Sequence, residues 1–334
     1  MFAKTTYYCA MDTTEGIMPV NEIKLNAYAK INLSLVVTGK RDDGYHNIRS
    51  LMQGIDLFDV IVLSKCAENG TKYNLPHCTI GGIVVYLCTD VETIPTDMTN
   101  LAMKGIAAVL SASGREPDFR EMLVTIEKRL PVAAGIAGGS GNAAACMLGM
   151  NALMGCPLSL RELMDAGARV GADVPFSLLM NAKRNSGLLT GLAGLEEASS
   201  AAWISGIGDV VEPAEPEKWY VVMANPGIAV STKAAYDAID KILDGTDRDA
   251  GDFPVFVNDL EKYTLKDYPE AAGIRAVMEK ELGADVVMMS GSGPTMIAYY
   301  TDRKKAEDGF ARMNSICENE PLWRTWFTTT GQFE

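Results

Sequence analysis

The feature that most constrains this chain is a charge-free segment that runs from Pro131 to Leu160 and opens with PVAAGIAGGSGNAAA. The segment is rich in glycine and alanine and holds few large apolar residues, whereas a membrane-spanning helix needs about 20 strongly apolar residues in succession. The pattern therefore predicts a strand over residues 122–130, a glycine-rich loop, and a buried helix from about Gly139 to Met154.

A loop of this kind brings bare backbone N–H groups to the positive end of a helix dipole, which suits a phosphate group. It is not a G-x-x-x-x-G-K-[ST] loop, because no lysine follows, and it does not fit the G-x-G-x-x-G fingerprint of dinucleotide-binding proteins. The same glycines could equally allow a helix to pack closely against its neighbours. Taken alone, the segment leaves a phosphate site and a packing role open.

The remaining sequence mixes strands and helices without the regular alternation of a doubly wound sheet. In the first half we expect strands at 23–38, 55–65 and 83–88, a helix at 100–113 capped by Asp97 or Thr99, and a helix from Ser159 to Val170. In the second half we expect strands at 219–224, 286–290, 295–300 and 323–329, and helices at 232–243, 269–282 and 303–313. These patterns predict an α+β protein.

A chain of 334 residues is long for one compact core, so its length favours two domains or one large domain with appendages. The predicted division is an N-terminal extension at 1–20, a mixed α/β domain at 21–185, a linker or insertion at 186–218, and a C-terminal α+β sandwich domain at 219–334. The linker is placed where glycine, alanine and serine are abundant and no strand or helix period is clear.

Composition narrows the possible partners. The formal net charge of −13 repels a nucleic-acid backbone, whereas a small phosphorylated ligand needs only local N–H groups and a few cations. Seven cysteines without a C-x-x-C pair, together with only two histidines, argue against a structural zinc site and for reduced thiols in a cytoplasmic protein. We expect no secretory segment, no membrane span and no nucleic-acid partner, and the oligomeric state stays open.

Three further patterns put polar residues in unusual places. In AKINLSL, Lys30 and Asn32 point to the same side of a strand that otherwise looks buried, although an edge strand could let the lysine reach solvent. In GADVPFSL, Asp173 is at the edge of an apolar run, where a carboxylate needs a partner and could be a base or a helix cap. Residues 44–46 (GYH) and 290–295 (SGSGPT) form turns that, alone, indicate only a solvated loop and a hairpin.

Together and in this order, AKINL, GYH, LP…AGGS…AAA, GADVPF and GSGPT resemble the GHMP kinase superfamily over about residues 23–300. The resemblance implies a two-domain GHMP kinase fold and an enzyme that uses ATP and Mg²⁺ to phosphorylate an alcohol group. The GADVPF motif and the AKINL–GYH pair are similar to the motifs of one branch of the superfamily. That branch acts on the 2-hydroxyl of a cytidine-diphosphate-linked methylerythritol, in the non-mevalonate isoprenoid route. The alternatives are a homoserine or mevalonate type of kinase, and a catalytically inactive nucleotide-binding member.

The resemblance also implies individual roles. Asp173 would accept the hydroxyl proton, and Lys30 beside it would make that hydroxyl easier to ionise. His46 would read the cytosine edge, Tyr236 would stack on the cytosine, and Ser140 would contact Mg²⁺. The implied substrate-binding residues are Asn32, Tyr45, His46, Tyr236, Gly291, Ser292 and Gly293. The implied ATP-binding residues are Asn100, Lys128, Pro131, Gly135, Gly138, Gly139, Ser140, Gly141 and Asn142.

The phosphate loop departs from the superfamily pattern at two positions. Ala137 stands where a further glycine is usual, and Gly141 replaces the second residue of a serine pair. Ser140 would then be the only hydroxyl available to the phosphates or the metal. The stretch around 180–205 is also longer than is usual in the family. These departures bear on the efficiency of the loop and on the local path of the chain, not on the class of reaction.

Overall fold

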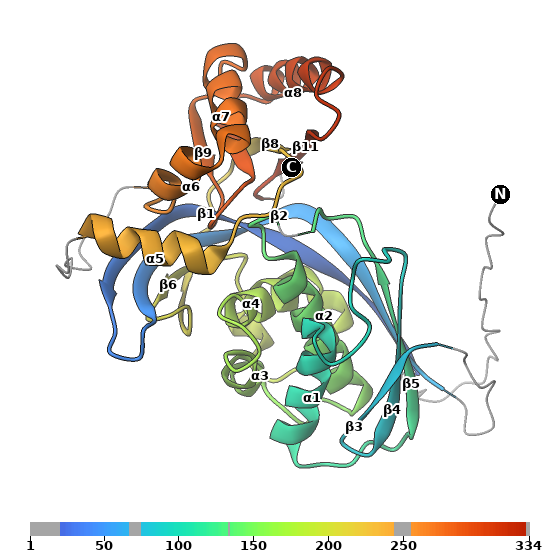
Figure 1. Cartoon of the computed structure of the whole chain (residues 1–334). Helices are drawn as coiled ribbons and strands as arrows, with labels where there is room; N and C mark the ends of the chain where they lie inside the picture. Colours follow the sequence, from blue (N-terminus) through green and yellow to red (C-terminus); the bar gives the residue numbers. More distant parts are fainter. Residues whose placement is uncertain (1–20, 67–74, 133, 244–254, 332–334) are drawn as a thin grey trace.

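The computed structural model describes residues 21–66, 75–132, 134–243 and 255–331. The predicted extension at 1–20 lies outside the described residues. The described chain forms a larger and a smaller β-sheet, each with helices packed on it (Figure 1). Among the described residues, none of the helices is both long enough and apolar enough to cross a bilayer.

The larger sheet is built on a long antiparallel hairpin of two strands, β1 and β2. One edge of β2 pairs with β1, and the other edge pairs with β6 near the start of β2 and with β5 near its end. β4 and β3 extend the sheet beyond β5, and β7 extends it beyond β6. The strands are β1 (Glu22–Lys40), β2 (His46–Lys65), β3 (His77–Ile80), β4 (Ile83–Thr89), β5 (Glu121–Glu127), β6 (Ala201–Ser205) and β7 (Val210–Ala214).

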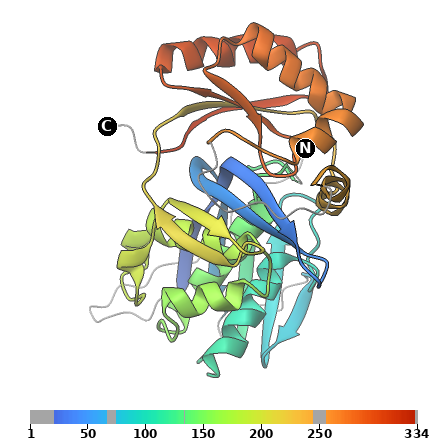
Figure 2. The same cartoon turned by 90° about the vertical axis from the view of Figure 1, so that its left-hand side faces the viewer.

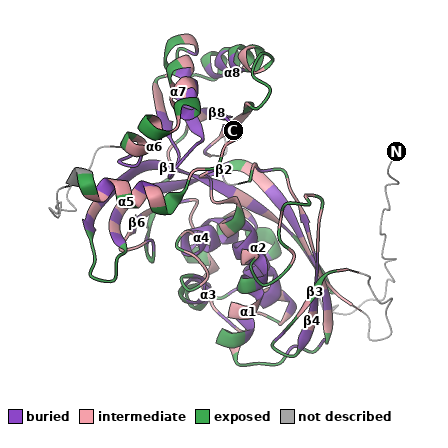
Figure 3. Cartoon of the chain, viewed as in Figure 1, coloured by how far each residue is buried: buried purple, intermediate pink, exposed green. Residues whose placement is uncertain are grey.

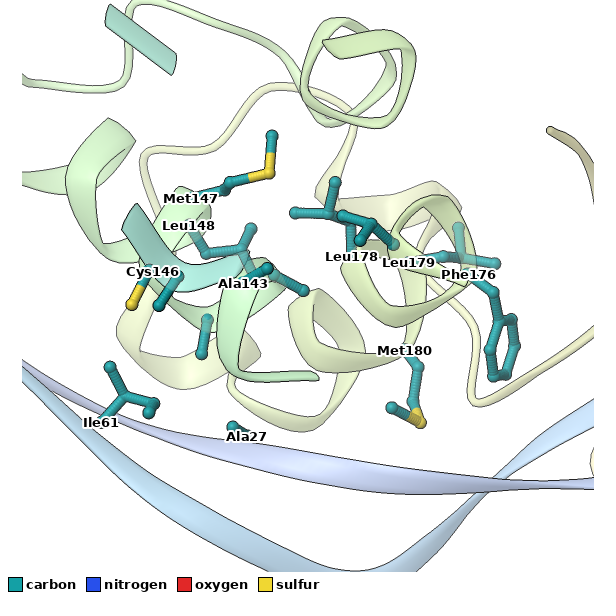
Figure 4. Packing of buried hydrophobic residues seen from close by; sticks show 14 of the residues in the cluster. Ala27, Ile61, Ala143, Cys146, Met147, Leu148, Phe176, Leu178, Leu179 and Met180 are labelled. Atoms are coloured by element: carbon teal, nitrogen blue, oxygen red, sulfur yellow. The ribbon is translucent and has the colours of Figure 1, made fainter. Parts of the chain in front are cut away.

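Four helices cover one face of this sheet, and α2 is the most deeply buried of them. These are α1 (Leu101–Ser113), α2 (Gly138–Leu153), α3 (Leu160–Gly167) and α4 (Val174–Arg184). Figure 4 shows the packed layer, in which Cys146 of α2 and Met180 of α4 lie on the side of the helices that faces Ile61 and Ala27 of the sheet. The charge-free segment is therefore a core helix, as its composition predicts.

The smaller sheet has the order β11-β8-β10-β9, and its neighbours are all antiparallel. Its strands are β8 (Tyr220–Asn225), β9 (Val286–Met289), β10 (Met296–Tyr300) and β11 (Arg324–Thr329). The helices of this half are α5 (Thr232–Leu243), α6 (Glu261–Asp267), α7 (Pro269–Glu281) and α8 (Arg303–Cys317). α7 and α8 cover the face of the smaller sheet that is turned away from the larger sheet (Figure 2).

The inner face of the smaller sheet packs on the β1–β2 hairpin. Ile31 and Leu33 of β1 share a hydrophobic cluster with Met223, Ile297 and Tyr299 of the smaller sheet. Figure 3 shows that buried residues fill the layers between sheets and helices, whereas the outer sides of α7 and α8 are exposed. This apolar contact places the two glycine-rich turns of the chain next to each other.

Most of the predicted elements are present, two predictions differ, and α4, β3, α6 and the first half of β2 were not predicted. Residues 186–218, expected as a linker or insertion, include β6 and β7, which belong to the larger sheet because β6 pairs with β2. The apolar run after Asp173 is helix α4, since a proline in the first helical turn needs no N–H partner there. The cap of α1 is Asn100, whose side chain accepts the Ala102 N–H at 2.9 Å, and not Asp97 or Thr99.

Candidate active site

A cleft of about 1400 Å³ is lined by both halves of the chain. Its walls come from β1, the β1–β2 turn, the glycine-rich loop, the α3–α4 turn, the β6–β7 turn, the start of α5 and the turn after β9. Every predicted site residue lines this cleft except Gly141 and Gly293. The fold thus brings together residues that are as much as 262 positions apart, between Lys30 and Ser292.

Lys30 and Asp173 meet in this cleft. The Lys30 ammonium lies 3.4 Å from Oδ2 of Asp173; the lysine side chain is 4 % exposed and the aspartate side chain 32 % exposed. Asn32 Oδ1 accepts a 2.9 Å hydrogen bond from Lys30 Nζ, and Asn32 Nδ2 donates to Ser50 Oγ at 2.8 Å. The ammonium is therefore fixed by two oxygens, while the carboxylate beside it stays accessible from the cleft.

The path of β1 explains why a lysine from a core strand reaches the cleft. The pairing of β1 with β2 shifts register between Tyr28 and Lys30, and such an irregularity re-aims the following side chain. At the same point the Lys30 N–H donates to the Ile136 carbonyl at 3.1 Å, so the strand is joined to the glycine-rich loop. Among the described strands β1 pairs only with β2, so it is an edge strand, but Lys30 is buried and does not reach solvent.

The glycine-rich loop ends where α2 begins. Gly138, Gly139 and Ser140 form the first helical turn, so their free N–H groups lie at the positive end of the helix. Ala137 precedes them with a left-handed backbone, φ 56° and ψ 32°, which is costly for any residue with a Cβ atom. This conformation accounts for the preference for glycine at that position in related loops.

The loop and the turn after β9 are in direct contact. A Cβ atom at Gly135, which has φ +74°, would lie 2.5 Å from the Ser290 carbonyl oxygen and 2.8 Å from that of Gly293. In the other direction, a Cβ atom at Gly291 would lie 3.0 Å from the Gly135 oxygen. Both turns therefore need glycine because the two backbones approach each other closely, a reason that neither motif reveals alone.

Two predicted site residues serve packing instead of lining the cleft. A Cβ atom at Gly141 would lie 2.8 Å from the Tyr28 carbonyl oxygen, so this glycine lets α2 approach β1. A Cβ atom at Gly293 would lie 2.5 Å from Sδ of Met289, which is not among the residues that line the cleft. For Gly141, close helix packing, left open by the sequence, describes the position better than contact with a phosphate.

Lys128 is held next to the glycine-rich loop by a buried carboxylate. Its ammonium forms an ion pair with Asp59 of β2, and the two side chains are 5 % and 0 % exposed. The other oxygen of Asp59 accepts the N–H groups of Arg129 at 2.7 Å and Leu130 at 2.9 Å. The ammonium lies beside Gly138, where an added Cβ atom would be 3.6 Å from Nζ. Asp59 thus fixes both the lysine and the chain that leads into the loop.

The cleft attracts anions through helix ends more than through free cations. α1, α2, α4 and α5 each begin at a residue that lines the cleft: Leu101, Gly138, the cap Asp173 and Thr232. Each helix start contributes a partial positive charge. The cleft lysines all have a carboxylate partner: Lys30–Asp173, Lys40–Asp240, Lys128–Asp59 and Lys233–Asp237. A net charge of −13 is therefore compatible with a polyanion site.

The aromatic corner of the cleft contains Tyr45, His46 and Tyr236. Tyr45 is exposed, whereas His46 is buried and its ring is stacked on that of Tyr236, with centroids 5.1 Å apart and an angle of 25°. Burial raises the pKa of the Tyr236 hydroxyl, and the negative charge of Asp173 raises that pKa further, so the phenol stays neutral. Tyr236 was expected to stack on a cytosine, and the structure places one face of its ring against His46.

Three residues of the site escaped the sequence analysis: Arg169, which lines the cleft, and Asp59 and Asp240, which bind the cleft residues Lys128 and His46 from behind. Asp59 is a charge within the apolar strand IDLFDVIV, which is a signal that could have been used. Asp240 contacts His46 from α5 but has the spacing of an ordinary surface residue. Arg169 lines the cleft four positions before Asp173 and makes no ion pair with any carboxylate in the described ranges. Nothing in the sequence alone distinguishes Arg169 from other surface arginines.

Comparison with protein families gives two matches along the chain. Residues 100–181 match the GHMP kinases N terminal domain, and residues 238–319 match the GHMP kinases C terminal domain. The first match includes the glycine-rich loop, Lys128 and Asp173, and the second includes Asp240 and the turn after β9.

Similar proteins align over nearly the whole chain. A 4-diphosphocytidyl-2-C-methyl-D-erythritol kinase of Alkaliphilus metalliredigens is 32 % identical over 321 residues, which cover 92 % of this chain and 98 % of the relative. One of Clostridium perfringens is 34 % identical over 303 residues, which cover 86 % and 92 %. A crystal structure of a 4-(cytidine 5'-diphospho)-2C-methyl-D-erythritol kinase superposes with a TM-score of 0.66 at 25 % identity, covering 93 % of this chain and 100 % of that one. The chain therefore belongs to the GHMP kinases, within the family of 4-diphosphocytidyl-2-C-methyl-D-erythritol kinases.

Proposed function

We propose that this chain transfers the γ-phosphoryl group of ATP to the 2-hydroxyl of 4-diphosphocytidyl-2-C-methyl-D-erythritol. The observation that carries the proposal is the Lys30–Asp173 pair, 3.4 Å apart, in one cleft with the phosphate loop and the His46 corner. Relatives that are named for this activity align with almost the full length of the chain. ATP use follows from the kinase family, and the identity of the alcohol substrate rests on those relatives and on the aromatic corner.

The two charged side chains supply the acid–base chemistry. As the substrate hydroxyl oxygen bonds to the γ-phosphorus, its proton passes to a carboxylate oxygen of Asp173, and the bond between the γ-phosphorus and the leaving oxygen of ADP breaks. Lys30 stabilises the negative charge that develops on the attacking oxygen, and Asn32 holds the lysine in position. Phosphoryl transfer depends mainly on positioning and on charge neutralisation, which the loop N–H groups of α2 provide.

We further propose that Mg²⁺ accompanies ATP and that Ser140 supplies a protein oxygen to it. In the described part of the chain no group of three or more His, Cys, Asp or Glu could hold a metal ion unaided. Mg²⁺ fits this donor set, because it takes most of its ligands in kinases from phosphates and water and neutralises phosphate charge when bound. The buried Oδ1 of Asn142 lacks a partner in the described chain, and a donor group of the nucleotide complex would satisfy it.

The test is ADP release with 4-diphosphocytidyl-2-C-methyl-D-erythritol as acceptor. Asp173→Asn should lower kcat by about 10²- to 10⁴-fold, the usual contribution of a general base, while the Kd for ATP stays within about threefold. Asp209→Asn, which removes a carboxylate from another wall of the cleft, is the matched control and should keep kcat. Phosphorylation of homoserine or mevalonate without turnover of the cytidine compound would assign a sister kinase, and ATP binding without any turnover would assign an inactive member.

We also propose a domain division that follows the sheets. The N-terminal domain would comprise residues 21–185 together with β6 and β7, and the C-terminal domain would begin at 219, as expected. The supporting observation is that β6 and β7 pair only within the larger sheet among the described strands. A cytoplasmic location and the lack of a nucleic-acid partner stay predictions from composition.

A further inference from the structure

Helix α5 carries a carboxylate that contacts the tip of the β1–β2 hairpin. Asp240 Oδ1 lies 2.5 Å from His46 Nε2, and Asp240 Oδ2 accepts a 2.5 Å hydrogen bond from Lys40 Nζ. Lys40 and His46 are the last paired residues of the hairpin before its turn, so one aspartate binds both members of that pair. Figure 1 shows α5 beside the curved end of this hairpin.

The histidine ring is held from its face and from its edge by the same helix. Tyr236, one helical turn before Asp240, stacks on the ring, and Asp240 binds Nε2. The side chain of His46 is 6 % exposed, so the ring has little room to rotate. A ring fixed in this way keeps one orientation toward the cleft, which it lines.

The carboxylate also decides which ring nitrogen bears the proton. Burial alone would raise the pKa of Asp240, but hydrogen bonds from Lys40 and His46 outweigh it and hold that pKa below its usual range. An ionised carboxylate only accepts hydrogen bonds, so Nε2 must be the protonated nitrogen. In the neutral ring, Nδ1 is then an acceptor, and it makes no hydrogen bond to any residue that the structure describes.

We propose that Asp240 is a positioning residue that fixes the proton of His46 on Nε2 and thereby makes Nδ1 an acceptor for the exocyclic amino group of a cytosine base. This inference rests on the proposed function, because it takes the cytosine of that substrate as the base beside His46 and adds the role of Asp240. A uracil base presents a carbonyl oxygen where cytosine presents its amino group, so two acceptors would face each other and uracil would be rejected.

The first measurement concerns the ring proton and does not depend on activity. The chain has only two histidines, so an imidazole ¹H–¹⁵N spectrum contains at most two residues, and the exposed His77 is an internal reference. The wild-type protein should show a protected Nε2–H signal that disappears in His46→Gln and in Asp240→Leu. Asp240→Asn keeps an acceptor oxygen and should keep the signal. Asp237→Asn removes a charge from the same helix, where it pairs with Lys233, and should also keep it.

The second measurement is the ratio of the dissociation constants of UDP and CDP, with ATP affinity as the reference. The wild-type enzyme should bind CDP at least about tenfold more tightly than UDP, which corresponds to one lost hydrogen bond. Asp240→Leu should reduce this ratio to below about threefold, while Asp240→Asn and Asp237→Asn should retain it. The KM for ATP should change by less than about twofold in both Asp240 variants.

The outcomes separate the inference from the proposed function. A wild-type enzyme that neither discriminates CDP from UDP nor phosphorylates the cytidine substrate would remove the proposed function, whatever the ring proton shows. A selective wild-type enzyme whose Asp240→Leu variant loses the ring signal and keeps the ratio would overturn the role of Asp240. So would a ring signal that survives in Asp240→Leu. If the leucine variant does not fold, loss of the ratio in Asp240→Asn with the signal intact would overturn it equally.

Discussion

The Ser290 hydroxyl donates a 3.0 Å hydrogen bond to the carbonyl oxygen of Gly135, so the two glycine-rich turns are joined across 155 sequence positions. Asn258 supports the same contact by donating to the carbonyl oxygens of Met289 and Gly291, at 2.9 and 2.8 Å. The phosphate loop is thus held from the smaller sheet as well as from β1. Its shape before ATP binds is set by contacts from both halves of the chain.

This contact predicts the effect of filling the space at Gly135. Gly135→Ala would bring a Cβ atom to 2.5 Å from the carbonyl oxygen of Ser290, in addition to the strain of a positive φ. Gly155→Ala is a matched control, because Gly155 has φ +77° and open space around the added atom. We expect the control to lose about 1 kcal/mol of unfolding free energy and Gly135→Ala to lose about 2 kcal/mol more, in urea titrations. Equal losses would show that the close approach has no energetic weight.

Ala137 predicts a change in the opposite direction. Ala137→Gly relieves a left-handed backbone that costs about 1–2 kcal/mol, partly offset by the greater freedom of glycine in the unfolded chain. We therefore expect a stabilisation of up to about 1 kcal/mol, with kcat/KM kept or raised. Ala168→Gly, at an ordinary helical φ of −58°, should instead destabilise by about 0.5–1 kcal/mol. Thermal unfolding compares the two variants, and shifts of the same sign would contradict the strain.

The buried pair of Asp59 and Lys128 predicts a large loss when one partner is removed. Asp59→Leu leaves the ammonium of Lys128 buried without its partner and frees the N–H groups of Arg129 and Leu130. We expect a loss of about 3–5 kcal/mol in unfolding free energy. We also expect weaker ATP binding, because the residues that lead into the glycine-rich loop lose their contact with Asp59.

A surface pair provides the control for this loss. Asp118→Leu breaks the contact between Lys65 and an aspartate side chain that is 73 % exposed, and it should cost no more than about 1 kcal/mol. Denaturant titration measures both losses. A loss below about 1 kcal/mol for Asp59→Leu would show that the buried pair does not organise the loop.

Arg169 is the cleft cation without a carboxylate partner in the described chain, so its charge is available to a bound phosphate. Arg169→Ala should raise the KM for ATP or for the cytidine substrate about tenfold, and the difference from wild type should shrink as salt rises from 50 to 500 mM. Arg161→Ala removes an exposed arginine that pairs with Asp165 on α3, and it should leave both KM values unchanged. Unchanged KM values in Arg169→Ala would place that guanidinium outside the binding site.

The sequence predicts local structure well here, and it predicts partners less well. Alternation over residues 23–38 and the charge-free helix are short-range patterns, and the structure contains both elements. The Lys30–Asp173 pair was expected from the resemblance, and the two side chains do meet. Asp59 is 69 positions from Lys128 and Asp240 is 194 positions from His46, so no local pattern could pair them. The strands at 201–214 were missed because the small residues in AAWIS show little alternation between apolar and polar positions.

The convergence of helix starts on the cleft has a consequence for how the molecule tolerates change. Main-chain N–H groups do not titrate near neutral pH, and among substitutions only proline removes one, so the positive potential at these helix starts should persist over a wide pH range. Acidic and basic residues on the outer surface can then change while the affinity of the cleft for the nucleotide is kept. Many surface carboxylates keep the protein from aggregating in a crowded solution. Their number can therefore change independently of the affinity of the cleft.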